Sequence, residues 1–111
     1  MPADAFEVEL TRGAEGDLAA IHGYIASNRS VDDADALLDE FLNSIATLER
    51  FPQRGAVPKE LDALGIREFR QILLRHFRVI YRVMDAKVFV MIIADGRRDM
   101  QALLERRLLG Q

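Results

Sequence analysis

The sequence predicts an α+β fold: an N-terminal strand, an antiparallel helical hairpin packed on a mainly antiparallel four-stranded sheet, and a C-terminal helix. Two observations carry this prediction. Apolar residues recur at helical spacing in the first half of the chain, and they alternate with basic residues between Gly65 and Asp99, where seven arginines lie. The length of 111 residues suits one domain spanning 1–111.

The first half of the chain supplies one strand and two helices. Residues 6–10 (FEVEL) alternate apolar and acidic side chains, as a strand with one solvated face does. Residues 14–25 and 37–48 each carry a single apolar helical stripe. Asp32 or Asp33 is expected to cap the second helix, and Pro52 to end it. The short polar link between the stripes predicts an antiparallel hairpin.

The second half supplies three strands and the last helix. After a turn-rich link (51–64) with one helical turn expected at 59–64, the strands are predicted at 66–74, in 75–84 with alternation from Phe77, and at 88–94. Phe77 and Tyr81 are expected to pack under the helices. The continuous apolar run at 88–94 predicts a central strand, reached by a tight turn at 85–87. Asp99 is expected to cap a helix with leucines along one side.

Composition excludes several classes of protein. There is no cysteine, so disulfides and thiolate chemistry are excluded, and the two histidines do not make a metal site; we expect no cofactor. The longest apolar run has seven residues, and no leader sequence is expected, so we predict a cytoplasmic protein with no membrane partner. Residues 1–63 carry a net charge of -8 and residues 64–111 carry +5, which places the basic groups on the predicted sheet.

Five strings, in this order, carry a resemblance to a known family. They are DLAAIHGYI, FPQRG, GIREFRQ, FRVIYRV and ADGRRDMQALL. Together with the predicted layout, they resemble the RelE/ParE family of bacterial type II toxins, from about Ala14 to Leu109. The resemblance implies a small growth-arresting toxin that is neutralised by a cognate antitoxin. It also implies that operator DNA is bound only through that antitoxin, which would be a ParD-like ribbon-helix-helix protein.

The family has two mechanistic branches. RelE-like toxins cut mRNA on the ribosome with lysines and arginines of the sheet and a C-terminal proton-transfer group, whereas ParE-like toxins inhibit DNA gyrase by protein contact. Arg78 and Arg98 match branch arginines by position, but neither Lys59 nor Lys87 lies on the strand where RelE-like lysines are expected. Leu104 stands where the C-terminal tyrosine would be, and a lone His76 is a weak substitute. The sequence is therefore closer to the ParE-like branch, and we expect no catalytic residue.

The arginines of the sheet are the candidate functional surface, because the planar guanidinium makes paired hydrogen bonds to carboxylates of a partner protein. Alternation does not place all seven on one face, and we favour Arg70, Arg78, Arg82 and Arg98. A structural role is the alternative, in which Asp95 or Asp99 holds Arg78 and Arg82. Two other functions stay open: a ribosome-dependent mRNA endoribonuclease, and a non-toxic relative that still binds an antitoxin.

Overall fold

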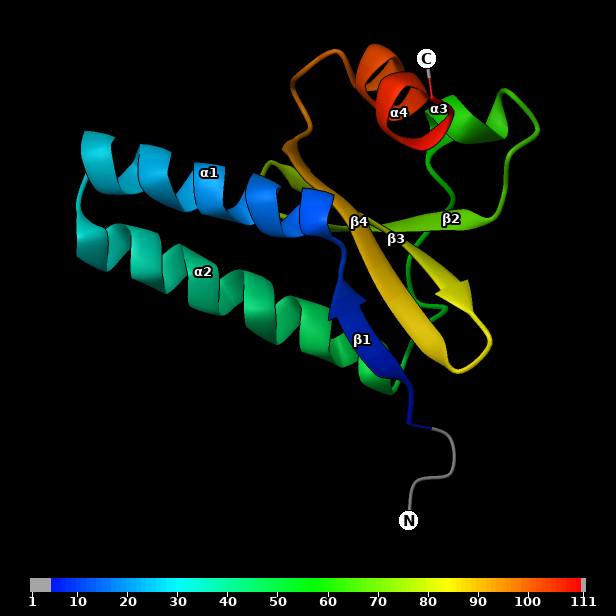
Figure 1. Cartoon of the computed structure of the whole chain (residues 1–111), viewed down its shortest axis with the longest axis horizontal. Coiled ribbons are helices and arrows are strands. Elements are labelled where there is room, and N and C mark those ends of the chain that lie inside the picture. Colours follow the sequence, from blue (N-terminus) through cyan, green and yellow to red (C-terminus); the bar gives the residue numbers. More distant parts are fainter. Residues whose placement is uncertain (1–4, 111) are drawn as a thin grey trace.

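A four-stranded sheet forms the centre of the molecule, with strand order β1-β4-β3-β2 (Figure 1). The computed structural model describes residues 5–110. In chain order the elements are β1 (Glu7–Leu10), α1 (Arg12–Asn28), α2 (Val31–Ala46), the 3₁₀ helix η1 (Thr47–Glu49), α3 (Lys59–Asp62), β2 (Phe69–Leu74), β3 (Phe77–Met84), β4 (Lys87–Asp95) and α4 (Met100–Leu108). β1 runs parallel to β4, and the other pairs are antiparallel. This is the predicted fold class.

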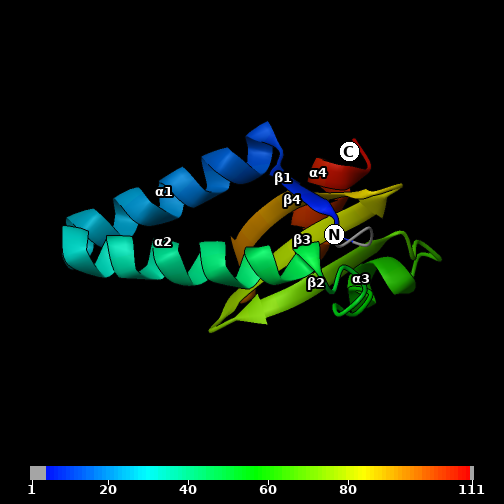
Figure 2. The ribbon, with the colours of Figure 1, turned by 90° about the horizontal axis from the view of Figure 1, so that it is seen from below.

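The helical hairpin of α1 and α2 covers one face of the sheet and extends beyond it (Figures 1 and 2). Thr11 caps α1 by accepting a hydrogen bond from the Ala14 amide. Ser30 caps α2 by accepting from the Asp33 amide at 3.0 Å. The prediction that Asp32 or Asp33 is the cap was therefore wrong by two to three positions. Ser30 has the extended backbone that a cap requires, whereas both aspartates already lie in the first helical turn, beside the positive end of the helix dipole.

The sheet separates two apolar clusters. On the hairpin face, Phe77, Val79 and Tyr81 of β3 pack against residues of α1 and α2, as the alternation predicted. On the opposite face, Ile80 and Ile92 pack against Leu104 of α4 and Leu61 of α3. Both faces of the central strands are thus covered, which explains why β4 reads as a continuous apolar run. The position of α4 opposite the hairpin was not predicted from the sequence.

A β-bulge interrupts the pairing of β4 with β3. Tyr81 pairs with Val90 and Ile80 with Ile92, so Met91 is the extra residue. Beyond Leu10, which pairs with Val90, β1 ends, and the outer edge of β4 has no strand neighbour. The polar backbone groups of this edge therefore need side-chain partners, which α1 and α4 supply as described below.

The second strand is shorter than predicted. It begins at Phe69 rather than Ile66, because the Ile66 amide donates to the Leu61 carbonyl and so closes the short helix α3. The two hairpin turns that follow are tight; the one after β3 was expected, and the one after β2 was not predicted. Arg75 and Asp85 each have a positive φ of 55°, a conformation that two-residue hairpin turns require. Asp99 caps α4 by accepting from the Ala102 amide at 3.1 Å, which confirms that prediction.

Candidate functional site: the arginines of the sheet

The four favoured arginines do not share one face of the sheet. Arg78 and Arg82 lie on the face of β3 that α3 and α4 cover, because they alternate with Val79 and Tyr81 of the hairpin face. Arg70 lies opposite Tyr81 in the register of β2 and β3, which places it on the hairpin face. Arg98 follows β4 in the link to α4. Arg78 and Arg82 therefore share one face of the sheet, four positions apart on β3, and Arg70 lies on the other face.

Arg78 is held inside the molecule by Glu60 of α3. Its two terminal nitrogens donate to the two Glu60 carboxylate oxygens at 2.9 and 2.8 Å, and its Nε donates to Gln71 at 2.7 Å. The side chains of Arg78 and Glu60 are only 11% and 13% exposed. The hydrogen bonds from Arg78 lower the pKa of Glu60 from 4.5 to about 2, against the opposing effect of burial.

Glu60 was not the predicted partner of Arg78. Asp95 instead binds Arg97, whose guanidinium holds the pKa of the Asp95 carboxyl well below its usual range, and Asp99 caps α4. Glu60 precedes Arg78 by 18 positions and reaches it only because α3 folds back over the sheet. The Arg78 stem passes close to Gly96, where a Cβ would lie 2.9 Å from Arg78 Cδ, so this arrangement needs a residue without a side chain.

Arg82 and Arg70 each bind groups of the same chain, Arg82 through an aromatic ring and a carboxylate and Arg70 through backbone carbonyls. The Arg82 guanidinium lies 5.7 Å from the centre of the Phe69 ring and 3.6 Å from the Glu68 carboxylate. Arg70 donates to the carbonyls of Gly55 at 2.7 Å and Gln53 at 3.3 Å, and thereby fixes the turn that follows η1. Neither of Arg70's contacts neutralises its charge, because both acceptors are backbone carbonyls.

Arg98 is exposed, and only its backbone amide is engaged, by the Asp95 carbonyl. Across residues 5–110 its side chain has no ion-pair partner. His76 stacks on Phe77 at 4.3 Å and lies 3.7 Å from Asp95 at the same end of the sheet. Arg98 is thus the favoured arginine with the freest guanidinium, whereas Arg78 is the most enclosed.

Leu104 is fully buried in the cluster between α4 and the sheet. The position at which a RelE-like toxin would carry a proton-transfer group is therefore part of the core of this protein. In the described residues, no three histidine, cysteine or carboxylate side chains gather as metal ligands would. None of the helices in residues 5–110 is long and apolar enough to span a bilayer.

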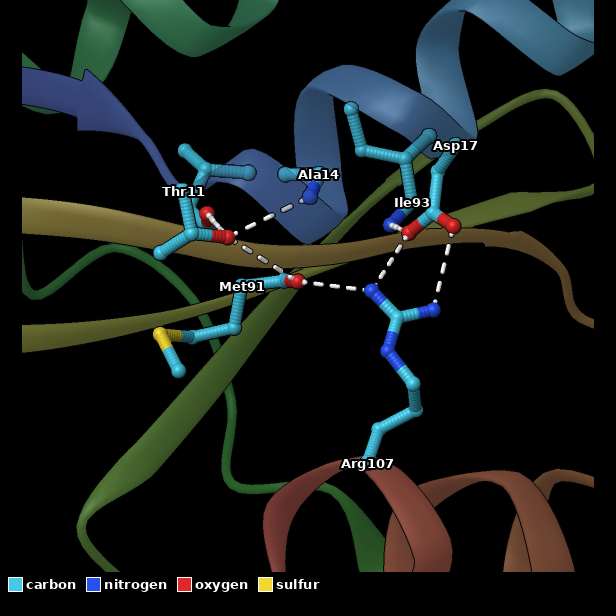
Figure 3. A network of polar contacts seen from close by, with 7 residues as sticks. Thr11, Ala14, Asp17, Met91, Ile93 and Arg107 are labelled. Carbon is cyan, nitrogen blue, oxygen red and sulfur yellow. Dashed lines mark hydrogen bonds and ion pairs between the residues drawn. The ribbon is translucent and has the colours of Figure 1, made fainter.

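Sequence reasoning missed a polar network at the free edge of β4 (Figure 3). Asp17 of α1 accepts from the Ile93 amide and from both terminal nitrogens of Arg107 of α4, all at 3.0 Å. Arg107 also donates to the Met91 carbonyl at the bulge, and Thr11 donates to the Val90 carbonyl. Asp17 lies off the apolar stripe of α1 and 90 positions from Arg107, so no local pattern indicates the contact.

Comparison with known proteins decides the family. A family model described as the ParE toxin of the type II toxin-antitoxin system parDE matches residues 8–100. The chain belongs to the ParE toxin family. It is therefore a toxin of the type II toxin-antitoxin class, as the sequence strings indicated.

Individual relatives agree with this family. The curated Toxin ParE3 of Caulobacter vibrioides is 29% identical over 97 residues, which cover 87% of this chain and 93% of the relative. A solved structure described as a chromosomal ParDE system from P. aeruginosa superposes with a TM-score of 0.70 at 18% identity, covering 84% of this chain and 98% of that one. The free state of a mutant E. coli toxin RelE gives 0.59 at 12% identity, covering 89% and 92%. The two structures establish that this ParE-family toxin shares their fold.

Proposed function

We propose that this ParE-family toxin arrests growth in the cytoplasm by inhibiting DNA gyrase through protein contact. The observation that carries the proposal is the enclosure of Arg78. Of the two arginines that match RelE-like branch residues, Arg98 is exposed, whereas Arg78 is bound at both terminal nitrogens by Glu60 and is 11% exposed. Arg78 is therefore poorly placed to neutralise a phosphate. At the position where a RelE-like toxin would carry its C-terminal proton-transfer group, this chain has the fully buried Leu104, which cannot donate a proton. These two features support action by protein contact more than action by cleavage.

The second part of the proposal is a cognate ParD-like antitoxin of the ribbon-helix-helix class, through which operator DNA is bound. The P. aeruginosa relative is described as part of a ParDE system. A hollow of about 450 Å³ lies beside the hairpin, where four apolar residues line it together with Glu15 and His22; the apolar residues are Leu10, Leu18, Ala19 and Leu38. An amphipathic helix of an antitoxin would fit an apolar hollow along a helix pair.

Supercoiling of relaxed plasmid by purified gyrase tests the target. We expect the toxin to inhibit the reaction, and the product of the adjacent reading frame to restore it and to co-purify with the toxin. Full supercoiling at excess toxin would contradict gyrase inhibition, and failure to co-purify would contradict the antitoxin assignment.

The exposed Arg98 favours one other candidate function, that of a ribosome-dependent endoribonuclease. This reading predicts cleavage of ribosome-bound message in a translating extract, and its loss in Arg98→Ala. We expect no cleavage by the wild-type toxin, since the other catalytic groups of that branch are absent or enclosed.

A further inference from the structure

The turn that follows η1 presents one aromatic ring to solvent. Phe51 is 62% exposed, although it adjoins the buried Pro52. The turn is compact: the Phe51 amide donates to the Thr47 carbonyl at 3.0 Å, and the Arg54 amide donates to the Phe51 carbonyl at 3.2 Å. The Phe51 side chain therefore stands on a hydrogen-bonded backbone rather than on an open loop.

Two side chains of the sheet form hydrogen bonds with the backbone of this turn. The buried Tyr81 hydroxyl donates to the Pro52 carbonyl at 2.8 Å and accepts from the Gly55 amide at 2.9 Å. Arg70 donates to the carbonyls of Gln53 and Gly55. A ring displayed on a backbone fixed at four points loses little further freedom when a partner binds it, which favours affinity.

The turn also carries positive charge that the rest of the molecule does not neutralise. Seven other arginines form ion pairs with carboxylates; these are Arg29, Arg67, Arg75, Arg78, Arg82, Arg97 and Arg107. Within residues 5–110, the other six form none: Arg12, Arg50, Arg54, Arg70, Arg98 and Arg106. Arg50 and Arg54 belong to the turn, Arg70 binds its carbonyls, and Arg54 donates a hydrogen bond to the Thr47 hydroxyl at 2.9 Å. Glu49 is the adjacent acidic residue, so the turn keeps an excess of guanidinium groups beside its exposed ring.

We propose that this turn, residues 50–55, is the anchor by which the toxin holds gyrase, with the Phe51 ring entering an apolar pocket rimmed by carboxylates. The inference rests on the proposed gyrase target. A single exposed ring on a short hydrogen-bonded turn suits a pocket of a folded protein, whereas the hollow of about 450 Å³ beside the hairpin suits a segment of an antitoxin. Single-stranded nucleic acid is disfavoured, because its binding uses several stacking rings along a basic groove and this turn offers one.

The test compares Phe51→Ala and Arg54→Ala with Tyr24→Ala, which removes an aromatic ring that is 67% exposed elsewhere on the hairpin. We expect each turn variant to raise the toxin concentration for half-inhibition of gyrase supercoiling about tenfold or more. Tyr24→Ala should leave it unchanged. All three should keep the wild-type melting temperature and the wild-type affinity for the product of the adjacent reading frame, because the altered side chains are exposed.

The outcomes separate the two proposals. If the wild-type toxin does not inhibit gyrase, the proposed function and this inference both fail. If the wild-type toxin inhibits gyrase and the turn variants do so equally well, only this inference fails. An equal loss of affinity for the antitoxin would assign the turn to the antitoxin instead. A labelled single-stranded oligonucleotide that binds the wild-type toxin, but not the turn variants, would assign it to nucleic acid; either result overturns the inference.

Discussion

The Arg78–Glu60 pair makes the fold sensitive to acid. The pKa of Glu60 is lowered from 4.5 to about 2, so the unfolded chain takes up this proton at a higher pH than the folded protein does. The contribution of the pair is therefore complete above about pH 4.5 and is lost as the pH falls from 4.5 towards 2. The shift corresponds to ~3 kcal/mol, an order-of-magnitude value for a carboxylate this enclosed.

Glu60→Gln should remove that pH dependence. We expect the free energy of unfolding of the variant to be lower than that of the wild type at pH 7, and to change less between pH 5 and 3. Urea unfolding at each pH measures both quantities. Glu68→Gln is the matched control, because Glu68 is 54% exposed and lies 3.6 Å from Arg82. An identical pH dependence in Glu60→Gln and wild type would contradict the assignment of the pKa.

Gly55 and Gly23 should respond to alanine with opposite signs. At Gly55 a Cβ would lie 2.5 Å from the Gln71 carbonyl oxygen and 2.6 Å from the Tyr81 hydroxyl, so Gly55→Ala is expected to destabilise the fold by roughly 1–3 kcal/mol. At Gly23, inside α1, a Cβ meets nothing within 4 Å, and Gly23→Ala should stabilise by roughly 0.5–1 kcal/mol. Thermal unfolding of the two variants measures both signs. Stabilisation by Gly55→Ala would contradict the close approach of Gly55 to the Gln71 carbonyl and the Tyr81 hydroxyl.

Among the elements, α4 is joined to α1 by the Asp17–Arg107 contact across the free edge of β4. Asp17→Ala leaves the Ile93 amide without its acceptor and removes the carboxylate partner of Arg107, so we expect a loss of roughly 2–4 kcal/mol. In the Asp17→Ala variant, amide hydrogen exchange should be faster than in the wild type at Ile93 and along α4, and this increase should be larger than any increase along α2. The double variant with Arg107→Ala should be less destabilised than the sum of the single ones. Asp39→Ala, at an exposed site on α2, is the control.

Periodicity in the sequence was sufficient to predict the elements but not their long-range contacts. The stripe of α1, the alternation of β3 and the apolar run of β4 report on burial within one element, and each was found where predicted. The second stripe is also buried, but α2 ends at Ala46, before Pro52, and Leu48 lies in η1. The pairing of Arg78 with Glu60 depends instead on how α3 folds back over the sheet, and that of Asp17 with Arg107 on where α4 docks. Such contacts join segments far apart in the chain, and no short pattern encodes them.

For the molecule as a whole, arginines bound to carboxylates of the same chain are candidates for a structural role, and arginines without such a partner are candidates for binding another molecule. Arg78 stabilises the packing of α3 on the sheet, and Arg70 positions the 50–55 turn through two carbonyls. Arg98 and the arginines of that turn form no ion pair within the described residues, and the same holds for Arg12 and Arg106. The functional surface of Arg70, Arg78, Arg82 and Arg98 stays a prediction. Of these four, Arg98 has the guanidinium that is freest to bind a carboxylate of a partner protein.

The most direct test of this account is a titration of purified gyrase with the purified toxin, with supercoiling of relaxed plasmid as the readout. Supercoiling is expected to fall as toxin is added and to return when an equimolar amount of the adjacent gene's product is present. Undiminished supercoiling at a large excess of folded toxin would contradict it.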